Sequence, residues 1–288
     1  MTAYNREKYI GEAIESVLAS TYQNFELIIM DDCSIDRTVK IASDYQKKDK
    51  RISVYVNNKN LGQFTNRNKA AGYAKGKYLK YFDSDDILYS HSLLKMVESM
   101  EQFPAAGAGI ICYGNDFIGK TPVLFSSREC YINHYFNGST FLAVGPSGTI
   151  FRRDVFEKMG RFDENSGILS DTLLMMRIAA IMPIVGLENN LFYWRIHNEQ
   201  VTEGQKKVFE MLLERHNINQ TILNSPDCPL TSEEIKIVQR NLKNIFIRNL
   251  PKLAANMSLK NTLISIKKFG ISTNDLLRAF RKNYRVRY

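Results

Sequence analysis

The sequence predicts an α/β fold built around a doubly wound sheet. In the first hundred residues, segments with apolar residues at helical spacing alternate with short, continuous apolar runs. Such continuous runs are typical of parallel strands that are buried on both faces. The composition agrees, because 288 residues with 44% apolar and 24% charged residues are typical of a folded globular protein.

The expected elements follow one another as helix and strand. Residues 7–20 carry Ile10, Ile14 and Val17 on one helical face, and the run FELIIM at residues 25–30 predicts a buried strand. Further helices are expected at 36–48, 63–74 and 89–102, and further strands at 52–56 and 78–82. Strands separated by single helices predict parallel pairing through right-handed crossovers.

The first strand is unusually short. A doubly wound sheet has a central strand ahead of its first helix, but only Met1, Thr2 and Ala3 precede the turn at Tyr4 and Asn5. We therefore expect that Met1 is an internal residue of a longer apolar strand, truncated in this sequence.

Beyond residue 105 the pattern becomes mixed. Strands are expected at 107–113, 148–152 and 191–196, with helices at 153–159 and 171–181. After residue 200 only helical signals remain, at 205–223, 232–250, 259–269 and 274–283. We therefore expect an α/β domain over residues 1–200 and a helical appendage over residues 201–288.

The positive charge is concentrated in this appendage. Residues 1–200 hold 23 basic and 23 acidic residues, whereas residues 201–288 hold 16 and 7. The last segment, 278–288, interleaves five basic residues with three aromatic residues. This mixture predicts contact with an anionic membrane surface. A solvated chain terminus is the alternative, and nucleic acid is a less favoured partner.

Other functional classes find no support. The longest nearly apolar run, residues 178–187, is ten residues long and contains Pro183, whereas a membrane-spanning helix needs about 20. The four cysteines form no C-x-x-C pair, which argues against a zinc site or a disulfide framework. No G-x-G-x-x-G fingerprint follows a predicted strand, so a nicotinamide-dependent dehydrogenase is not indicated.

The acidic run Asp83-Ser84-Asp85-Asp86 is the strongest candidate for a functional site. It directly follows the apolar run YLKYF, and ligands of open α/β sheets bind at the carboxyl ends of strands. Three neighbouring carboxylates repel each other, and Mg²⁺ or Mn²⁺ prefers oxygen ligands of this kind. The alternative is that the aspartates cap a helix N-terminus.

A second acidic pair, Asp31-Asp32, follows the strand FELIIM in the same way. Parallel strands would bring the pair and the Asp83–Asp86 run to one edge of the sheet. The alternative is local, because Asp32 or Ser34 could cap the helix that begins near Asp36.

Together these motifs resemble glycosyltransferase family 2, the inverting enzymes of the GT-A fold, in the type that builds bacterial surface polysaccharides. The resemblance covers residues 1 to about 200. It rests on TAYNR at 2–6, IESVL at 14–18, TYQNFELII at 21–29, DDCSID at 31–36, NLG at 60–62, NRN at 66–68, AKGKY at 74–78 and DSDD at 83–86.

The resemblance implies a GT-A catalytic domain that binds a nucleotide-diphospho-sugar donor. Asp32 would accept a hydrogen bond from the uracil ring, and Asp83, Asp85 and Asp86 would hold Mn²⁺ or Mg²⁺, which stabilises the leaving diphosphate as a Lewis acid. The donor-binding residues that it implies are Thr2, Tyr4, Asn5, Asp32, Asn66, Asn68, Asp83, Ser84, Asp85 and Arg195.

The later motifs imply the acceptor side of the site. The segments GTIFRR at 148–153 and GRFDE at 160–164 precede Asp171, which the resemblance makes the general base that deprotonates the acceptor hydroxyl. Taken alone, Asp171 is more simply explained as an ordinary cap of the helix that it opens. Arg195 and His197 resemble a late Arg-x-His element, with Arg195 at the diphosphate and His197 as a further metal ligand.

Three positions depart from the family pattern. Cys33 and Ala70 stand where glycine is common, which affects local turns. Ser170 stands where the family has an acidic neighbour of Asp171, so the acceptor contacts are expected to differ.

The expected function is therefore inverting transfer of a sugar, most simply from a UDP-sugar, to a hydroxyl of a glycan or lipid-linked acceptor in cell-surface polysaccharide synthesis. A cytoplasmic location, peripheral to the inner face of the cell membrane, would fit this acceptor. Two alternatives stay open. One is a metal-dependent nucleotidyl or phosphoryl transferase, and the other is a catalytically silent subunit that binds nucleotide-sugar.

Overall fold

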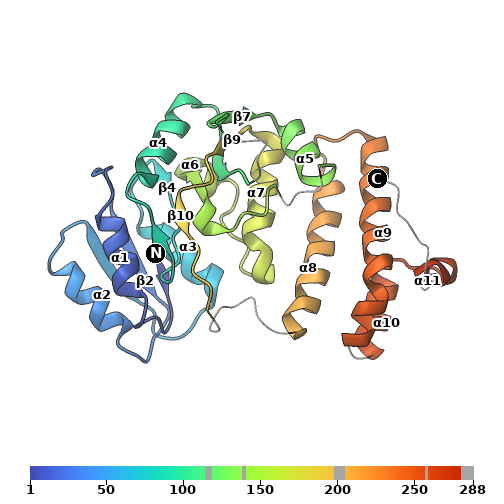
Figure 1. Ribbon diagram of the computed structural model, residues 1–288, viewed down its shortest axis with the longest axis horizontal. Helices are drawn as coiled ribbons and strands as arrows, with labels where there is room; N and C mark the ends of the chain where they lie inside the picture. The colour runs from blue at the N-terminus through green and yellow to red at the C-terminus, as the bar shows by residue number, and fades with distance from the viewer. Residues whose placement is uncertain (114–118, 138–140, 198–204, 257–258, 280–288) are drawn as a thin grey trace. The chain divides into compact units, whose positions relative to one another are not determined.

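The computed structural model describes residues 1–113, 119–137, 141–197, 205–256 and 259–279 (Figure 1). The chain divides into two compact units, Met1–Ile196 and His197–Tyr288. The first contains the β-sheets, and the described residues of the second are mostly helical.

The first unit begins with a parallel three-stranded sheet. Strands β1 (Thr2–Ala3), β2 (Leu27–Asp31) and β3 (Ile52–Val56) lie in that order, with Thr2 opposite Met30 and Leu27 opposite Ile52. Figure 1 shows helices α1 (Ile10–Leu18) and α2 (Thr38–Gln46) on one side of β2 and α3 (Gln63–Tyr73) on the other. The alternating helices and strands and their parallel pairing are confirmed here.

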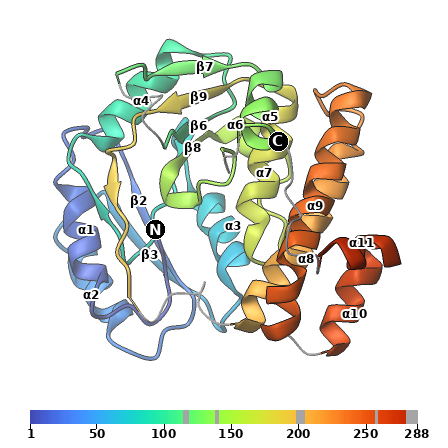
Figure 2. The ribbon, with the colours of Figure 1, turned by 45° about the vertical axis from the view of Figure 1, so that its right-hand side comes forward.

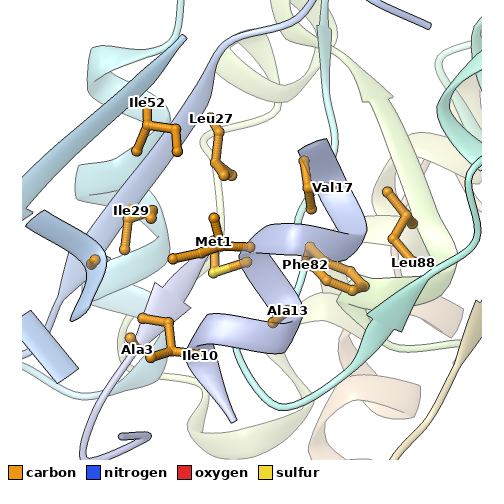
Figure 3. Close-up of a cluster of buried hydrophobic side chains, with 12 residues drawn as sticks. Met1, Ala3, Ile10, Ala13, Val17, Leu27, Ile29, Ile52, Phe82 and Leu88 are labelled. Atoms are coloured by element: carbon orange, nitrogen blue, oxygen red, sulfur yellow. The ribbon is translucent and has the colours of Figure 1, made fainter. Parts of the chain in front are cut away.

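Apolar side chains from these elements form one core. Figure 3 shows Met1, Ile10, Val17 and Leu27 converging with Phe82 between the strands and α1. The Met1 ammonium donates a hydrogen bond of 2.8 Å to the Ile28 carbonyl, so the pairing of β1 with β2 includes the first residue. Burial lowers the pKa of this ammonium to about 5.

The second sheet is mixed. Its order is β4 (Tyr78–Leu79), β8 (Thr149–Arg152), β6 (Ala108–Ile111), β9 (Ile184–Leu187) and β7 (Val123–Phe125). Among the described strands of this sheet, β6 and β9 pair in parallel and the other neighbours pair antiparallel. A short antiparallel pair joins β5 (Ile87–Leu88) to β10 (Phe192–Tyr193).

The prediction of parallel pairing is wrong for the strand expected at 78–82. Tyr78 and Leu79 alone form β4, which pairs antiparallel with β8. The following residues turn towards the first sheet, where Asp83 forms an isolated parallel bridge with Thr2. This segment therefore passes from one sheet to the other, and a local apolar run contains no information on such a change of partner.

The remaining helices described in this unit are α4 (Ser92–Gln102), α5 (Ser127–Tyr135), α6 (Arg153–Lys158) and α7 (Ser170–Ile181), with short 3₁₀ turns at Pro146–Gly148 and Gly167–Leu169. Helix α5 is not among the predicted elements, although Ser126 and Glu129 form a complete capping box at its start, a signal that the sequence does carry. Strand β9 is also absent from the prediction, because its residues continue the apolar run of α7.

Gly186 in β9 gives a test of the packing of this sheet. A Cβ atom there would lie 2.6 Å from the Phe125 ring and 2.8 Å from the Cys112 sulfur. We expect Gly186→Ala to lower the free energy of unfolding by about 1–3 kcal/mol, because the buried neighbours must shift. Gly72→Ala is the control, because its nearest neighbour would lie at 3.9 Å. Chemical denaturation measures both, and an unchanged midpoint for Gly186→Ala would contradict this packing.

The second unit consists of helices α8 (Gln205–Leu223), α9 (Ser232–Asn256), α10 (Leu259–Lys268) and α11 (Thr273–Ala279) over its described residues (Figure 2). The Phe269 ring stacks on Phe246 at 3.9 Å and lies 4.1 Å from the His216 ring, which joins the end of α10 to α9 and α8. Helix α9 continues past the predicted end at residue 250 and includes Pro251. None of the helices in the described parts of the chain is long and apolar enough to span a membrane.

Candidate active site

The acidic segments predicted from the sequence lie at the edge where β1 and β2 end. Thr2 lies between them, because it pairs with Met30 of β2 and forms the bridge with Asp83. The run Asp83–Asp86 and the pair Asp31-Asp32 therefore follow neighbouring segments of the sheet. Both acidic segments therefore lie near one edge, as expected, but the single bridge between Thr2 and Asp83 brings them there rather than parallel pairing of the strand expected at 78–82.

The two carboxylates at the end of β2, Asp31 and Asp32, accept hydrogen bonds from different loops. Asp31 accepts hydrogen bonds from the Ser34 backbone N–H (2.7 Å) and hydroxyl (2.5 Å), and burial raises the pKa of Asp31. Asp32 is buried and accepts hydrogen bonds of 2.9 Å from the backbone N–H groups of Leu61 and Gly62. Asp32 therefore anchors the NLG segment, and its predicted contact with a uracil ring stays a prediction.

The loops after β1 and β2 are tied together in a strained conformation. Asn5 and Cys33 both have left-handed backbones, with φ of 52° and 69°. The Asn5 N–H donates to the Ser34 hydroxyl oxygen (2.8 Å), and the Asn5 side-chain oxygen accepts from the Ile35 N–H (3.0 Å). Left-handed residues other than glycine cluster at functional sites. The φ of Cys33 lies in the left-handed region, which glycine adopts more readily than a residue with a side chain.

The side chains of Asn66 and Asn68 point into the protein rather than to an open site. Asn66 donates to the Met30 carbonyl (3.0 Å) and accepts from Asn57 (2.8 Å). Asn68 donates to the Phe162 carbonyl (2.8 Å) and accepts from the Phe162 N–H (3.1 Å). Both therefore act as scaffold in this structure, and their contact with a nucleotide-sugar stays a prediction.

Asp83 is paired with Arg67, a residue that sequence reasoning did not single out. The Arg67 guanidinium donates to the Asp83 carboxylate at 2.6 Å and lies over the Phe64 ring at 5.5 Å. The Arg67 Nε is buried and has no hydrogen-bond partner among the described residues. The position of Arg67 between Asn66 and Asn68 in the NRN motif was the available signal.

Asp85 and Asp86 are bound by two further arginines. Arg6 Nε donates to the Asp85 carboxylate at 3.0 Å. Arg195 donates from its side chain to the Asp85 carbonyl (2.9 Å) and from its backbone to the Asp86 carboxylate (3.2 Å). The structure thus brings the predicted residue Arg195 to the acidic run. Burial raises the pKa of Asp86 to about 6.

Lys80 adds a fourth cation behind this run. Its ammonium donates to the Ser147 carbonyl, and the Ser147 hydroxyl accepts from the Asp83 N–H at 3.4 Å. Burial lowers the pKa of Lys80 to about 7, while Asp83 and Asp86 act in the opposite direction. Arginine side chains therefore pair with Asp83 and Asp85, whereas Asp86 accepts a hydrogen bond from the Arg195 backbone and has a raised pKa.

The carboxylate oxygens are of the type that Mn²⁺ and Mg²⁺ prefer. Within the described residues, however, no three His, Cys, Asp or Glu side chains are arranged to hold an ion. Asp83 and Asp85 each face an arginine instead. His197 belongs to the second compact unit. The arrangement therefore does not form a metal centre by itself, and the metal-ligand roles stay predictions.

Asp171 lies at the second position of α7 and accepts a hydrogen bond of 2.7 Å from the Thr172 N–H. Burial raises the pKa of Asp171 above its ordinary range. The Arg67 guanidinium opposes this increase and the Asp83 carboxylate adds to it, so the three charges act on one another. The neighbouring Ser170 hydroxyl is buried without a partner in the described part of the chain. A capping role and a role as base are both compatible with this position.

Comparison with known proteins identifies the family. A model described as glycosyl transferase family 2 matches residues 1–160. The chain belongs to glycosyl transferase family 2. Among the relatives, TuaG of Bacillus subtilis, named for glycosyl transfer in teichuronic acid biosynthesis, is 41% identical over 98 residues. This match covers 34% of the chain and 39% of TuaG, and the other first-ranked relatives are likewise covered over less than half of their length.

Two solved structures share the fold of this chain. S. aureus TarS, residues 1–349, in complex with UDP-GlcNAc, superposes with a TM-score of 0.72 over 97% of this chain and 80% of TarS, at 20% identity. The mannosyltransferase PcManGT from Pyrobaculum calidifontis, in complex with GDP-Man and Mn²⁺, superposes with a TM-score of 0.65 over 96% of this chain and 81% of that protein, at 14% identity. The expected GT-A fold is thereby confirmed.

Proposed function

We propose that this protein is an inverting glycosyltransferase that moves a sugar from a UDP-sugar to a hydroxyl of a glycan or lipid-linked acceptor in cell-surface polysaccharide synthesis. The observation that carries the proposal is the Asp83–Arg67 pair at the carboxyl edge of β1, with Asp171 in the same electrostatic environment. The biosynthetic name of TuaG supports the pathway, and the UDP-GlcNAc complex of TarS supports the nucleotide.

Residues of this chain are available for each part of the proposed reaction, in which the acceptor hydroxyl displaces the nucleoside diphosphate from the sugar. The cations Arg6, Arg67 and Arg195 are positioned to attract a diphosphate to the strand edge. Asp171 would accept the proton of the acceptor hydroxyl as its oxygen attacks the anomeric carbon. Attack from the face opposite the leaving diphosphate inverts that carbon. The raised pKa of Asp171 makes it a stronger base than an ordinary aspartate.

A divalent cation remains part of the proposal. Mn²⁺ or Mg²⁺ bound by Asp83, Asp85 and Asp86 would supply Lewis-acid stabilisation of the departing diphosphate. Binding would require Asp83 and Asp85 to exchange their arginine partners for the ion. The Mn²⁺ in the mannosyltransferase complex supports this proposal.

The proposed membrane location involves residues 278–288. In this segment the structure describes the backbone of Arg278 and Ala279, at the end of α11, and residues 280–288 lie outside the described residues. Peripheral attachment to the cytoplasmic face of the membrane would place the enzyme beside a lipid-linked acceptor.

A panel of UDP-, GDP- and dTDP-sugars tests the proposed reaction. Each donor is added with Mn²⁺ or Mg²⁺, and thermal stabilisation and nucleoside diphosphate release are recorded. We expect one UDP-sugar to stabilise the protein and to release UDP, and a chelator to remove both effects. Release of pyrophosphate or phosphate would instead indicate a nucleotidyl or phosphoryl transferase, and binding without turnover would indicate a silent subunit.

A further inference from the structure

Helix α10 exposes apolar side chains on a basic surface. Leu263 and Ile264 are 56% and 42% exposed. Lys260, Lys267 and Lys268 are also exposed and lie three or four residues from this pair along the helix. Residues at this spacing share one helical face. The outer face of α10 therefore consists of two large apolar side chains with lysines on both sides.

The opposite face of α10 carries two buried polar side chains beside the partly buried Ile266. Thr262 and Ser265 are 8% and 1% exposed, and the Ser265 hydroxyl donates to the Asn261 carbonyl at 3.0 Å. An ordinary surface helix buries its apolar residues and exposes its polar ones. Helix α10 departs from this pattern, because it exposes Leu263 and Ile264 while it buries Thr262 and Ser265. Packing within the unit does not require Leu263 and Ile264, since the stack of Phe269 on Phe246 already joins the end of α10 to α9. Exposed apolar side chains rimmed by polar residues are found at interaction surfaces, and here lysines flank the pair.

The positive charge on this face favours an anionic partner over a second copy of the same unit. Residues 201–288 hold 16 basic and only 7 acidic residues, so a second copy of this unit would meet α10 with the same sign of charge. An anionic surface would instead be attracted by Lys260, Lys267 and Lys268. Apolar residues flanked by lysines are typical of helices that lie in the interface of an anionic membrane.

We propose that α10 is a membrane-contacting helix, in which Leu263 and Ile264 enter the boundary between headgroups and acyl chains while Lys260, Lys267 and Lys268 contact anionic lipid headgroups. This surface is distinct from residues 278–288. The proposal rests on the membrane location proposed above but not on the transfer reaction. Binding to vesicles therefore tests it separately from glycosyl transfer.

The apolar part is tested with Leu263→Gln/Ile264→Gln in the full-length chain. Ile181→Gln is the matched control, because Ile181 is an isoleucine of α7 that is 45% exposed. We expect the intact protein and the control to sediment with vesicles that contain phosphatidylglycerol. The double variant should bind about tenfold or more weakly, because it loses the burial of two apolar side chains. Equal binding of the double variant and the intact protein would overturn the proposal.

The charged part is tested with Lys267→Gln/Lys268→Gln, against Lys48→Gln/Lys50→Gln, which removes the same charge from the first unit. We expect roughly 10- to 30-fold weaker binding for the α10 pair, at about 1 kcal/mol for each lysine. If the protein bound vesicles of pure phosphatidylcholine as strongly as vesicles with phosphatidylglycerol, the proposed contact of the lysines with anionic headgroups would be refuted. Circular dichroism establishes that each variant is folded.

Two further results would contradict membrane contact by α10, either by giving its exposed face another partner or by giving vesicle binding to another segment. A monomer–dimer equilibrium that Leu263→Gln/Ile264→Gln abolishes, without vesicle binding by the intact chain, would identify a second copy as the occupant. Loss of vesicle binding in Arg281→Gln/Arg285→Gln, with full binding by both α10 variants, would assign the contact to residues 278–288 alone. Either result would overturn the role of α10.

Discussion

Asp171→Asn is expected to reduce sugar transfer by a factor of about 10²–10⁴ while leaving donor affinity unchanged. The amide cannot take the proton of the acceptor hydroxyl. Its oxygen can still accept the hydrogen bond from the Thr172 N–H, so the start of α7 is preserved. Steady-state transfer assays and donor titration by calorimetry measure the two quantities separately.

The pH dependence of transfer provides a second measure of the same residue. Burial raises the pKa of Asp171, and the reactive form is the carboxylate, so kcat/KM should fall as the pH decreases through this raised pKa. Arg67 lowers the pKa of Asp171, so Arg67→Met should shift this acidic limb to higher pH. A limb at the ordinary aspartate pKa in both proteins would argue against Asp171 as the base.

Asp154→Asn is the control for Asp171→Asn. Asp154 pairs with Arg152 on the surface of α6, and its side chain is 66% exposed. The control should transfer sugar at the rate of the unmodified protein. Loss of donor binding in Asp171→Asn as complete as in a variant of the acidic run would contradict the assignment of Asp171 to the acceptor side.

Asp85→Ala is expected to weaken donor binding about 100-fold in the presence of Mn²⁺ or Mg²⁺ and to abolish the dependence of binding on the ion. The carboxylate of Asp85 lies at the strand edge, where Arg6 faces it at 3.0 Å. Removing this carboxylate removes an oxygen ligand of the type that such ions prefer. Donor titrations with and without chelator measure the effect.

Arg6→Ala separates the carboxylate from its ion pair. This variant breaks the Arg6–Asp85 pair but keeps the carboxylate, so ion-dependent binding of the donor should persist. A loss of binding as large as that of Asp85→Ala would show that the pair, rather than the carboxylate as an ion ligand, supports the site. Donor binding by Asp85→Ala that still depends on the ion would exclude the proposed role of Asp85.

The order of helices and strands is largely encoded in local sequence. Strand β3 and helix α8 have the bounds that hydrophobic periodicity predicts, residues 52–56 and 205–223. Periodicity succeeds because each element buries one face or both, and the chain must place apolar residues accordingly. The family motifs likewise point to Asp83, Asp85, Asp171 and Arg195, because each lies within a short segment that resembles the family pattern.

Local sequence does not predict which strands pair, or which side chains contact each other, when the segments lie far apart in the chain. The apolar run at residues 78–82 looks like any parallel strand, yet β4 pairs antiparallel with β8, which lies about 70 residues later in the chain. Arg67 of α3 pairs with Asp83, and Asp32 with the backbone of Leu61 and Gly62, only because separate segments of the chain meet at one strand edge. These contacts depend on distances between segments that are remote in sequence.

The sequence by itself determined the α/β class, the family and the acidic run, because burial periodicity and motif spacing are local properties of the chain. The tertiary structure decided which arginines face Asp83 and Asp85, how burial shifts the pKa of Asp171 and Asp86, and that α10 exposes Leu263 and Ile264. Each of these depends on the solvent exposure and neighbours of a side chain, which are set only when distant segments pack together.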